Sequence, residues 1–215
     1  MLNKAETIKL YPEFFRREDE LPDGLFYEKP RLYVHHIDED ARKAVSSLYR
    51  ELLPEGHILD FMAGWESHLP IGFKQVTGLG LNKVELEHNL QLSRHYVHDI
   101  NHSDALPFET EQFDGAVCTV SVQYMTRPGE TFAEIARSLK PGVPFIVTFS
   151  NRMFPSKAVL AWRSSNDAAH IRLVKSYFAQ ARAFGEAKTH YFVPKEGDPV
   201  YAVWAYKHLN AVKLN

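Results

Sequence analysis

Residues 57–67 read HILDFMAGWES, in which a short apolar run ends at Asp60 and passes into a loop that contains a glycine. An apolar run of this length, followed by turn-forming residues, is typical of a buried β-strand. Stretches with helical periodicity separate it from further runs of the same kind. The alternation predicts an α/β fold with a largely parallel sheet and helices on both faces. The further runs lie at 75–79, 95–99, 113–121 and 143–150.

The helices are predicted from the spacing of apolar residues between these runs. One begins near Asp38, has acidic residues in its first turn and ends at Pro54, as the helix dipole and the missing N–H of proline favour. Two final strand-like runs, 187–193 and 199–207, are joined by the turn-rich KEGDP, which predicts antiparallel pairing at the end of the sheet. Further helices are predicted at 82–89, 129–140 and 155–183.

The length and composition of the chain limit its domain count, its location and the kinds of partner it can bind. The chain has 215 residues, 45% of them hydrophobic, which suits one domain with a substantial core. Its formal net charge of -2 gives no basic excess, so we expect no nucleic-acid partner. The opening residues do not resemble a secretory signal, and no apolar run approaches the roughly 20 residues that span a bilayer. Together with the single cysteine, Cys118, these features predict a cytoplasmic protein without a membrane partner.

We expect two parts of unequal size. Residues 1–36 are an irregular leader with several prolines, and residues 37–215 form a single domain without internal repeats or a linker. In an open parallel sheet, ligands bind beyond the carboxyl ends of the strands, where the strand order reverses. A functional site is therefore expected in the loops that follow the first four predicted strands.

Four short motifs stand at the edges of these loops. Together they are a more specific signal than any one of them alone. They are Asp60 at the end of the first strand, Asp99 before the Leu-Pro-Phe turn at 106–108, Phe113-Asp114 at the start of the fourth strand, and Leu-Lys-Pro-Gly at 139–142.

In order and spacing, the motifs resemble those of class I S-adenosylmethionine-dependent methyltransferases, particularly the group whose third-strand loop ends in Leu-Pro-Phe. The resemblance covers residues 58–152. It implies a three-layer Rossmann-like sandwich with a mostly parallel seven-stranded sheet and an antiparallel strand at its C-terminal end. It also implies S-adenosylmethionine as the cofactor and a small molecule as the methyl acceptor, whereas the oligomeric state is not predicted.

The glycine motif departs from the family pattern. The family's Asp-x-Gly-x-Gly-x-Gly is here DFMAGWE at 60–66, so only Gly64 remains. Glycines at these positions let the backbone approach the methionine portion of the cofactor without a Cβ in the way. We therefore expect Met62 and Glu66 to crowd that approach, with the Glu66 carboxylate near the cofactor's own carboxylate.

The resemblance also assigns the adenosine end of the site. Gly80 stands where the family has the acid that binds the ribose, and Asn82 or Glu85 is expected to replace it. Asp99 is expected to accept a hydrogen bond from the adenine amino group, with Ile100 packed on the ring. The alternative for Asp99 is a loop aspartate that caps nearby backbone amides.

The leader adds one candidate cofactor-binding residue, Arg31. Related proteins often fold this segment over the cofactor as a lid, and Arg31 is expected to pair with the cofactor's carboxylate and so to offset Glu66. In the alternative, Arg31 caps a helix end while Tyr27 and Tyr33 anchor the leader to the core. The expected cofactor-binding residues are Asp60, Ala63, Gly64, Gly80, Asn82, Asp99, Ile100 and Arg31.

Methyl transfer is an in-line displacement in which alignment supplies much of the rate, and a base is needed only when the acceptor carries a proton. His68 and Tyr124 are the candidate bases, although packing explains both residues equally well. The histidines at 95, 98 and 102 do not predict a metal site, because no second cluster with ligand spacing accompanies them. A non-catalytic relative that binds a ligand or partner through the altered pocket remains the alternative function.

Overall fold

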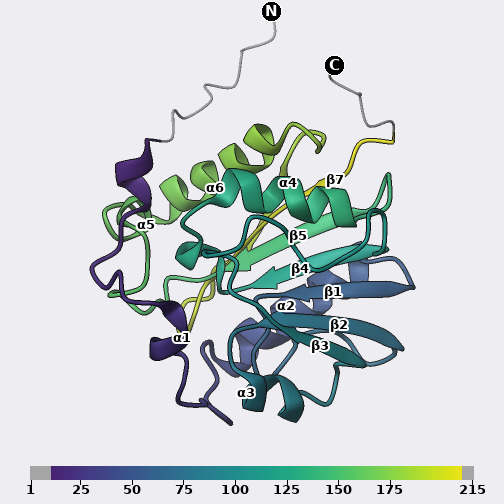
Figure 1. Cartoon of the computed structure of the whole chain (residues 1–215), viewed down its shortest axis with the longest axis horizontal. Coiled ribbons are helices and arrows are strands. Elements are labelled where there is room, and N and C mark those ends of the chain that lie inside the picture. Colours follow the sequence, from purple (N-terminus) through teal and green to yellow (C-terminus); the bar gives the residue numbers. More distant parts are fainter. Residues whose placement is uncertain (1–10, 210–215) are drawn as a thin grey trace, which may run out of the picture.

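The computed structural model describes residues 11–209 of the chain, and its centre is one seven-stranded sheet (Figure 1). The strands lie in the order β3-β2-β1-β4-β5-β7-β6. Each predicted strand is present, and the predicted fold class is confirmed. The strands are β1 His57–Phe61, β2 Gln75–Gly80, β3 Arg94–Val97, β4 Gly115–Thr119, β5 Pro144–Phe149, β6 Lys188–Phe192 and β7 Val200–Tyr206.

The direction of pairing determines where a ligand site can form. Strands β1 to β5 pair in parallel, and β7 runs antiparallel to both β5 and β6, as the two final sequence runs predict. From β1 the chain first builds outward through β2 to β3, and then returns to the other side of β1 to add β4 and β5. The strand order therefore reverses between β1 and β4, where the loops at the carboxyl ends diverge and leave a crevice.

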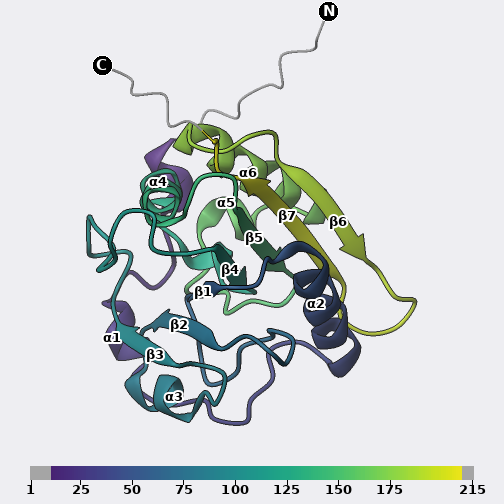
Figure 2. The same cartoon turned by 90° about the vertical axis from the view of Figure 1, so that its right-hand side faces the viewer.

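Helices cover both faces of the sheet (Figure 2). On one face α2 buries Ala41, Val45 and Tyr49 in a cluster with β1, β4, β5 and β7. On the other face α4 and α6 pack against each other and against the larger apolar cluster, in which Cys118 is fully buried. The helical elements are η1 Pro12–Phe15, α1 Asp23–Phe26, α2 Glu39–Leu52, α3 Lys83–His88, η2 Val122–Tyr124, α4 Pro128–Ser138, α5 Leu160–Arg163 and α6 Asp167–Ala181.

The helical region predicted over 155–183 consists of two helices, α5 and α6, with a turn between them. The sequence at the break is Ser164-Ser165-Asn166, and the Asn166 side chain accepts a hydrogen bond from the Ala169 N–H at the start of α6. Serine and asparagine bond to nearby backbone groups and favour helix ends over helix interiors.

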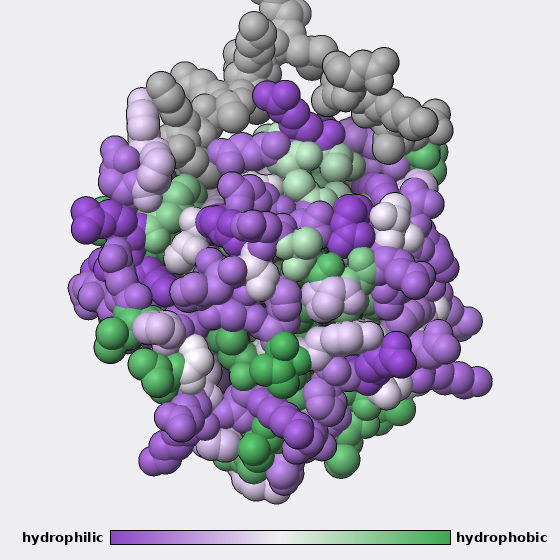
Figure 3. Space-filling model, viewed as in Figure 1, coloured by the Kyte–Doolittle hydropathy of each residue, from purple (hydrophilic) through white to green (hydrophobic). Residues whose placement is uncertain are grey.

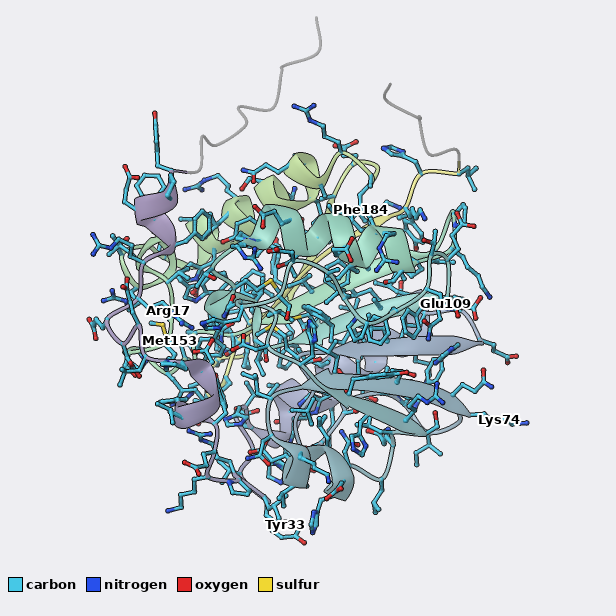
Figure 4. The ribbon with its side chains drawn as sticks, viewed as in Figure 1. Arg17, Tyr33, Lys74, Glu109, Met153 and Phe184 are labelled. Carbon is cyan, nitrogen blue, oxygen red and sulfur yellow. The ribbon has the colours of Figure 1, made fainter. Side chains whose placement is uncertain are left out.

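The described part of the leader, residues 11–36, runs along the side of the molecule toward which the arrowheads of β4 and β5 point (Figure 1). In Figure 4, Arg17 and Met153, of the segment after β5, both lie on this side of the view, and Tyr33 lies at its lower edge. Lys157, fully buried, contacts the carboxylates of Asp19 (3.0 Å) and Asp23 (3.3 Å). This ion cluster fastens the leader to the core.

The surface is mostly hydrophilic on the face seen in Figure 3, where the apolar residues form small separate groups. One such group lies over α1, whose Leu25 is 62% exposed. Within residues 11–209 no helix has both the length and the apolar character needed to cross a membrane.

Candidate functional site

A cavity opens at the carboxyl ends of β1 to β4, at the point where the strand order reverses. It holds about 1090 Å³ of empty space, part of which is open to solvent. The leader and the segment after β5 complete its wall with Tyr27, His36 and Phe154. The sequence-predicted residues Asp60, Ala63, Gly64, Gly80, Asn82, Asp99 and Ile100 all line it, as do His68 and Tyr124.

A buried polar network holds the loop after β1. Ser67 donates a hydrogen bond to the Asp60 carboxylate, and the Asn89 amide donates both to Ser67 Oγ (2.9 Å) and to the Gly64 carbonyl (2.9 Å). Burial raises the pKa of the Asp60 carboxyl to about 7, because the charged form is removed from water. Asp60 therefore holds the loop through Ser67, and Asp60 also lines the cavity.

Two non-glycine residues in the cavity wall have left-handed backbone conformations. Met62, at φ 61°, stands where the family motif has its first glycine, and Val120, at φ 44°, follows β4. Such a conformation costs about 1–2 kcal/mol for a residue with a Cβ, and more for a β-branched one. Strain of this kind collects at functional sites. Met62 thus adopts a backbone conformation that favours glycine while placing a side chain at the cavity.

The missing ribose acid at position 80 has a steric cause. The Ala63 N–H donates to the carbonyl of Leu79 (2.8 Å), so the first loop lies directly on the end of β2. A Cβ on Gly80 would run into the carbonyl oxygen of Ala63 and lie 3.2 Å from Leu86 Cδ2. No side chain fits at position 80 unless the first loop moves.

Asn82 and Glu85, the two expected replacements, have different roles in the structure. The Asn82 amide donates to the carbonyls of Tyr27 (2.6 Å) and Glu28 (3.1 Å), while its oxygen caps α3, so its side chain holds the leader. The Glu85 carboxylate accepts the Arg31 N–H through Oε1 (2.7 Å). Its Oε2 has no donor among the described residues and lies beside Gly64, at the cavity.

Asp99 makes the capping contacts expected of a loop aspartate and still lines the cavity. Its Oδ1 accepts the Asn101 N–H (2.9 Å) and its Oδ2 contacts His102 Nδ1 (2.9 Å), which leaves further lone pairs on both oxygens. Ile100, 7% exposed, lies next to it. The neighbouring His98 presents a buried Nε2 without a hydrogen-bond partner, and sequence analysis missed this group.

Trp65 and Glu66 turn toward the leader. Trp65 Nε1 donates to the Val34 carbonyl (3.0 Å), and its ring lies against Tyr33 and His35. Glu66 pairs with Arg42 (3.1 Å) and His35 (2.8 Å). Arg42 in α2 therefore offsets the Glu66 charge in this structure, and the expected pairing of Arg31 with the cofactor's carboxylate stays a prediction.

Arg31 does not line the cavity, and part of its role is the expected helix cap. Its Nη2 donates to the carbonyl of Phe26, the last residue of α1 (3.1 Å). Its guanidinium lies on the rings of Tyr27 and Phe154, which do line the cavity. Tyr27 anchors the leader as expected, whereas Tyr33 is 76% exposed and does not.

The candidate bases differ in their protonation. Burial lowers the pKa of His68 to about 4, so its ring is neutral at physiological pH. Burial raises the pKa of Tyr124, whose hydroxyl oxygen accepts the Phe154 N–H (2.9 Å) and keeps its proton for donation. Sequence analysis missed His36 as a third candidate base in the wall; its pKa is lowered by burial and by nearby Arg31. The only sequence feature that could have indicated His36 was the high density of polar residues in the segment before α2.

Comparisons with known proteins agree with the fold and the motifs. The family model described as a methyltransferase domain matches residues 64–147. The biotin biosynthesis bifunctional protein BioHC of Teredinibacter turnerae is 28% identical over 106 residues, 49% of this chain. The matched stretch is 19% of that longer protein.

Two solved structures resemble most of the chain. One, from the complex between the Haloferax volcanii Trm112 methyltransferase activator and a methyltransferase, has a TM-score of 0.62 and 17% identity, covering 80% of this chain and 92% of that one. The other, the [4+2]-cyclase SpnF, has a TM-score of 0.59 and 17% identity, covering 87% and 91%. These likenesses concern the fold. The ordered motifs and the family model, which matches residues 64–147, agree that this part of the chain is similar to a methyltransferase domain.

Proposed function

We propose that the protein transfers the methyl group of S-adenosylmethionine to a small-molecule acceptor. The observation that carries the proposal is the open cavity at the strand-order reversal, lined by Gly64, Asp99 and Ile100. Met62 and Glu66, the residues expected to crowd the cofactor, line a cavity that is still open, and Trp65 donates its hydrogen bond to the leader. A cavity in this position suits a cofactor and a small acceptor.

Features of the wall fit the adenosine part of the cofactor. The buried Nε2 of His98 lacks a partner, and an orphaned polar atom at a cavity wall is satisfied when a polar ligand binds. A Cβ on Gly64 would come within 3.2 Å of Glu85 Oε2, so the missing side chain leaves that carboxylate accessible. Glu85 is the residue that we assign to the ribose hydroxyls, and Asp99 with Ile100 would hold the adenine.

S-adenosylmethionine, when bound, supplies a methyl group activated by a sulfonium charge. The work of the protein is then to hold the acceptor in line with that methyl group and to exclude water. His36 and His68 are neutral near pH 7, so either ring is able to take a proton from an acceptor hydroxyl. Tyr124 retains its proton and would donate a hydrogen bond to the acceptor. A cytoplasmic location and the lid role of the leader stay predictions.

Calorimetric titration with S-adenosylmethionine and S-adenosylhomocysteine tests the proposal. We expect dissociation constants in the micromolar range, about 8 kcal/mol of binding free energy. Asp99→Ala should weaken binding about tenfold or more through the lost contact with the adenine. The matched control is Asp104→Ala, since Asp104 is 94% exposed and pairs with Arg127 outside the cavity. Absence of binding to folded protein would rule out the methyltransferase activity.

A further inference from the structure

Four residues with flat rings line one end of the cavity, which we call the aromatic end: Tyr27, His36, Tyr124 and Phe154. The Tyr124 ring stacks on Phe154 with centres 6.0 Å apart, and the His36 ring meets Phe154 edge-on at 5.6 Å. Tyr27 belongs to the same group, because the Arg31 guanidinium lies against both Tyr27 (5.2 Å) and Phe154 (5.0 Å). The adenosine is assigned to other residues of the wall, so the aromatic end is left for the acceptor.

No cationic side chain is open to an anion at this end. Among residues 11–209, the cavity wall contains no lysine or arginine. Arg17 and Lys157 lie beyond the wall and pair with Asp23 (2.7 and 3.3 Å). Arg31 contacts the rings without lining the cavity, so the rings separate it from a ligand. An acceptor carboxylate or phosphate would be held here without a counter-ion, which is costly.

Neither of the two carboxylates that act on the charges of this end is free for a cation. Asp23, 2% exposed, accepts two hydrogen bonds from Arg17 (2.7 and 2.8 Å). Glu66 pairs with Arg42 (3.1 Å) and His35 (2.8 Å). An acceptor cation would find both carboxylates committed, and the guanidinium behind the rings would repel it.

The groups that remain free at the aromatic end are uncharged. The Tyr27 hydroxyl and the His36 ring have no hydrogen-bond partner among residues 11–209. The Tyr124 oxygen accepts the Phe154 N–H (2.9 Å), and the Tyr124 proton has no acceptor among the same residues. Two hydroxyl donors and a neutral ring nitrogen suit an uncharged ligand with a hydroxyl of its own, and flat rings suit an aromatic one.

We propose that the methyl acceptor is an uncharged aromatic compound with a free hydroxyl group, and that His36 takes the proton of that hydroxyl. The inference rests on the proposed methyltransferase function and names its acceptor class. His36 is assigned in preference to His68, because His36 contacts Phe154 of the aromatic end, whereas His68 follows the first loop.

The transfer balances with these groups alone. The acceptor oxygen forms its bond to the methyl carbon while the carbon–sulfur bond breaks, and the electron pair of that bond stays on sulfur in S-adenosylhomocysteine. The hydroxyl proton passes to a ring nitrogen of His36 and then to water. The Arg31 charge behind the rings favours the negative charge that develops on the acceptor oxygen.

Three compounds with one phenol ring and different tail charges test the acceptor class. They are tyrosol, which is uncharged, tyramine, which is a cation, and 4-hydroxyphenylacetate, which is an anion. Each is titrated into protein saturated with S-adenosylhomocysteine and into protein alone. We expect tyrosol to bind about tenfold or more tightly than both charged compounds, because neither charged tail has a free partner. Equal or tighter binding of a charged compound overturns the proposal, as does the absence of binding by all three.

His36→Asn tests the proton transfer. With tyrosol as acceptor, kcat for the formation of S-adenosylhomocysteine should fall about hundredfold or more, while tyrosol binding changes little. His190→Asn is the matched control, since His190 is exposed on β6 and does not line the cavity. The assignment of His36 is wrong if His36→Asn retains its turnover or if only His68→Asn loses it. Tyrosol that binds without being methylated also overturns the proposal.

Failure of the proposed function has a different signature. If S-adenosylhomocysteine does not bind to folded protein, the methyltransferase activity is ruled out, and the titrations of protein alone still decide the charge preference of the aromatic end. If S-adenosylhomocysteine binds and tyrosol does not, the function stands and the acceptor class is wrong.

Discussion

Gly80→Ala should destabilise the protein, although it adds only one methyl group. The new Cβ would run into the Ala63 carbonyl oxygen and lie 3.2 Å from Leu86 Cδ2. Leu86 is able to rotate, whereas Ala63 is backbone that is held by its own hydrogen bond to Leu79. The first loop must therefore shift, with the loss of that bond or strain at Met62.

The magnitude follows from two contributions. Overpacking of a well-filled site costs about 1–3 kcal/mol, and loss of the Ala63 to Leu79 hydrogen bond about 1 kcal/mol. A total of about 2–4 kcal/mol lowers Tm by roughly 4–16 °C in a chain of this size. Gly24→Ala is the matched control, because a Cβ on Gly24 meets nothing within 4 Å, and removing a glycine there should leave Tm unchanged or slightly raised.

Thermal and urea unfolding of the two variants measure the effect. Gly80→Asp extends the test to ligand binding, since it restores the acid that the family uses for the ribose. We expect it to weaken S-adenosylhomocysteine binding, because the side chain displaces the first loop. If Gly80→Asp were as stable as the unmodified protein and bound the ligand more tightly, the steric account of position 80 would be refuted.

Two further variants probe the buried charges around the site. The stability of Asp60→Asn relative to the unmodified protein should increase as the pH rises from 5 to 8. Folding raises the pKa of Asp60 from 3.8 to about 7, so the unmodified protein loses stability as the pH rises toward 7. Urea midpoints at the two pH values measure the difference, and parallel pH profiles of the two proteins would contradict it. Lys157→Met should cost about 3 kcal/mol, because it leaves Asp19 and Asp23 short of a cation, and should speed trypsin cleavage within residues 16–36. Lys43→Met, at an exposed ion pair with Glu39, should change neither measurement, and equal effects of both lysine variants would reject the role of Lys157.

The elements of the sheet were predictable because each depends on local pattern. The run HILDF at 57–61 forms β1 with the predicted ends, and Asp38 caps α2 through the Ala41 N–H, as its acidic first turn indicates. The break at Ser164 to Asn166 was missed because apolar residues continue on both sides of it, so that periodicity outweighed the capping preference of three polar residues. Partners distant in sequence were also missed, including the pairing of Glu66 with Arg42.

The altered cofactor motif is where sequence comparison alone misleads most. Loss of two motif glycines and of the ribose acid suggests damage to the site, yet the altered residues have coherent structural roles. Met62 adopts a left-handed backbone conformation that favours glycine, and Gly80 makes room for the Ala63 carbonyl. Beyond the end of β2, Asn82 and Glu85 bind the backbone of the leader at Tyr27, Glu28 and Arg31. These bonds tie the leader to the cavity wall, so variants that loosen the leader should impair ligand binding even where no cavity residue is changed.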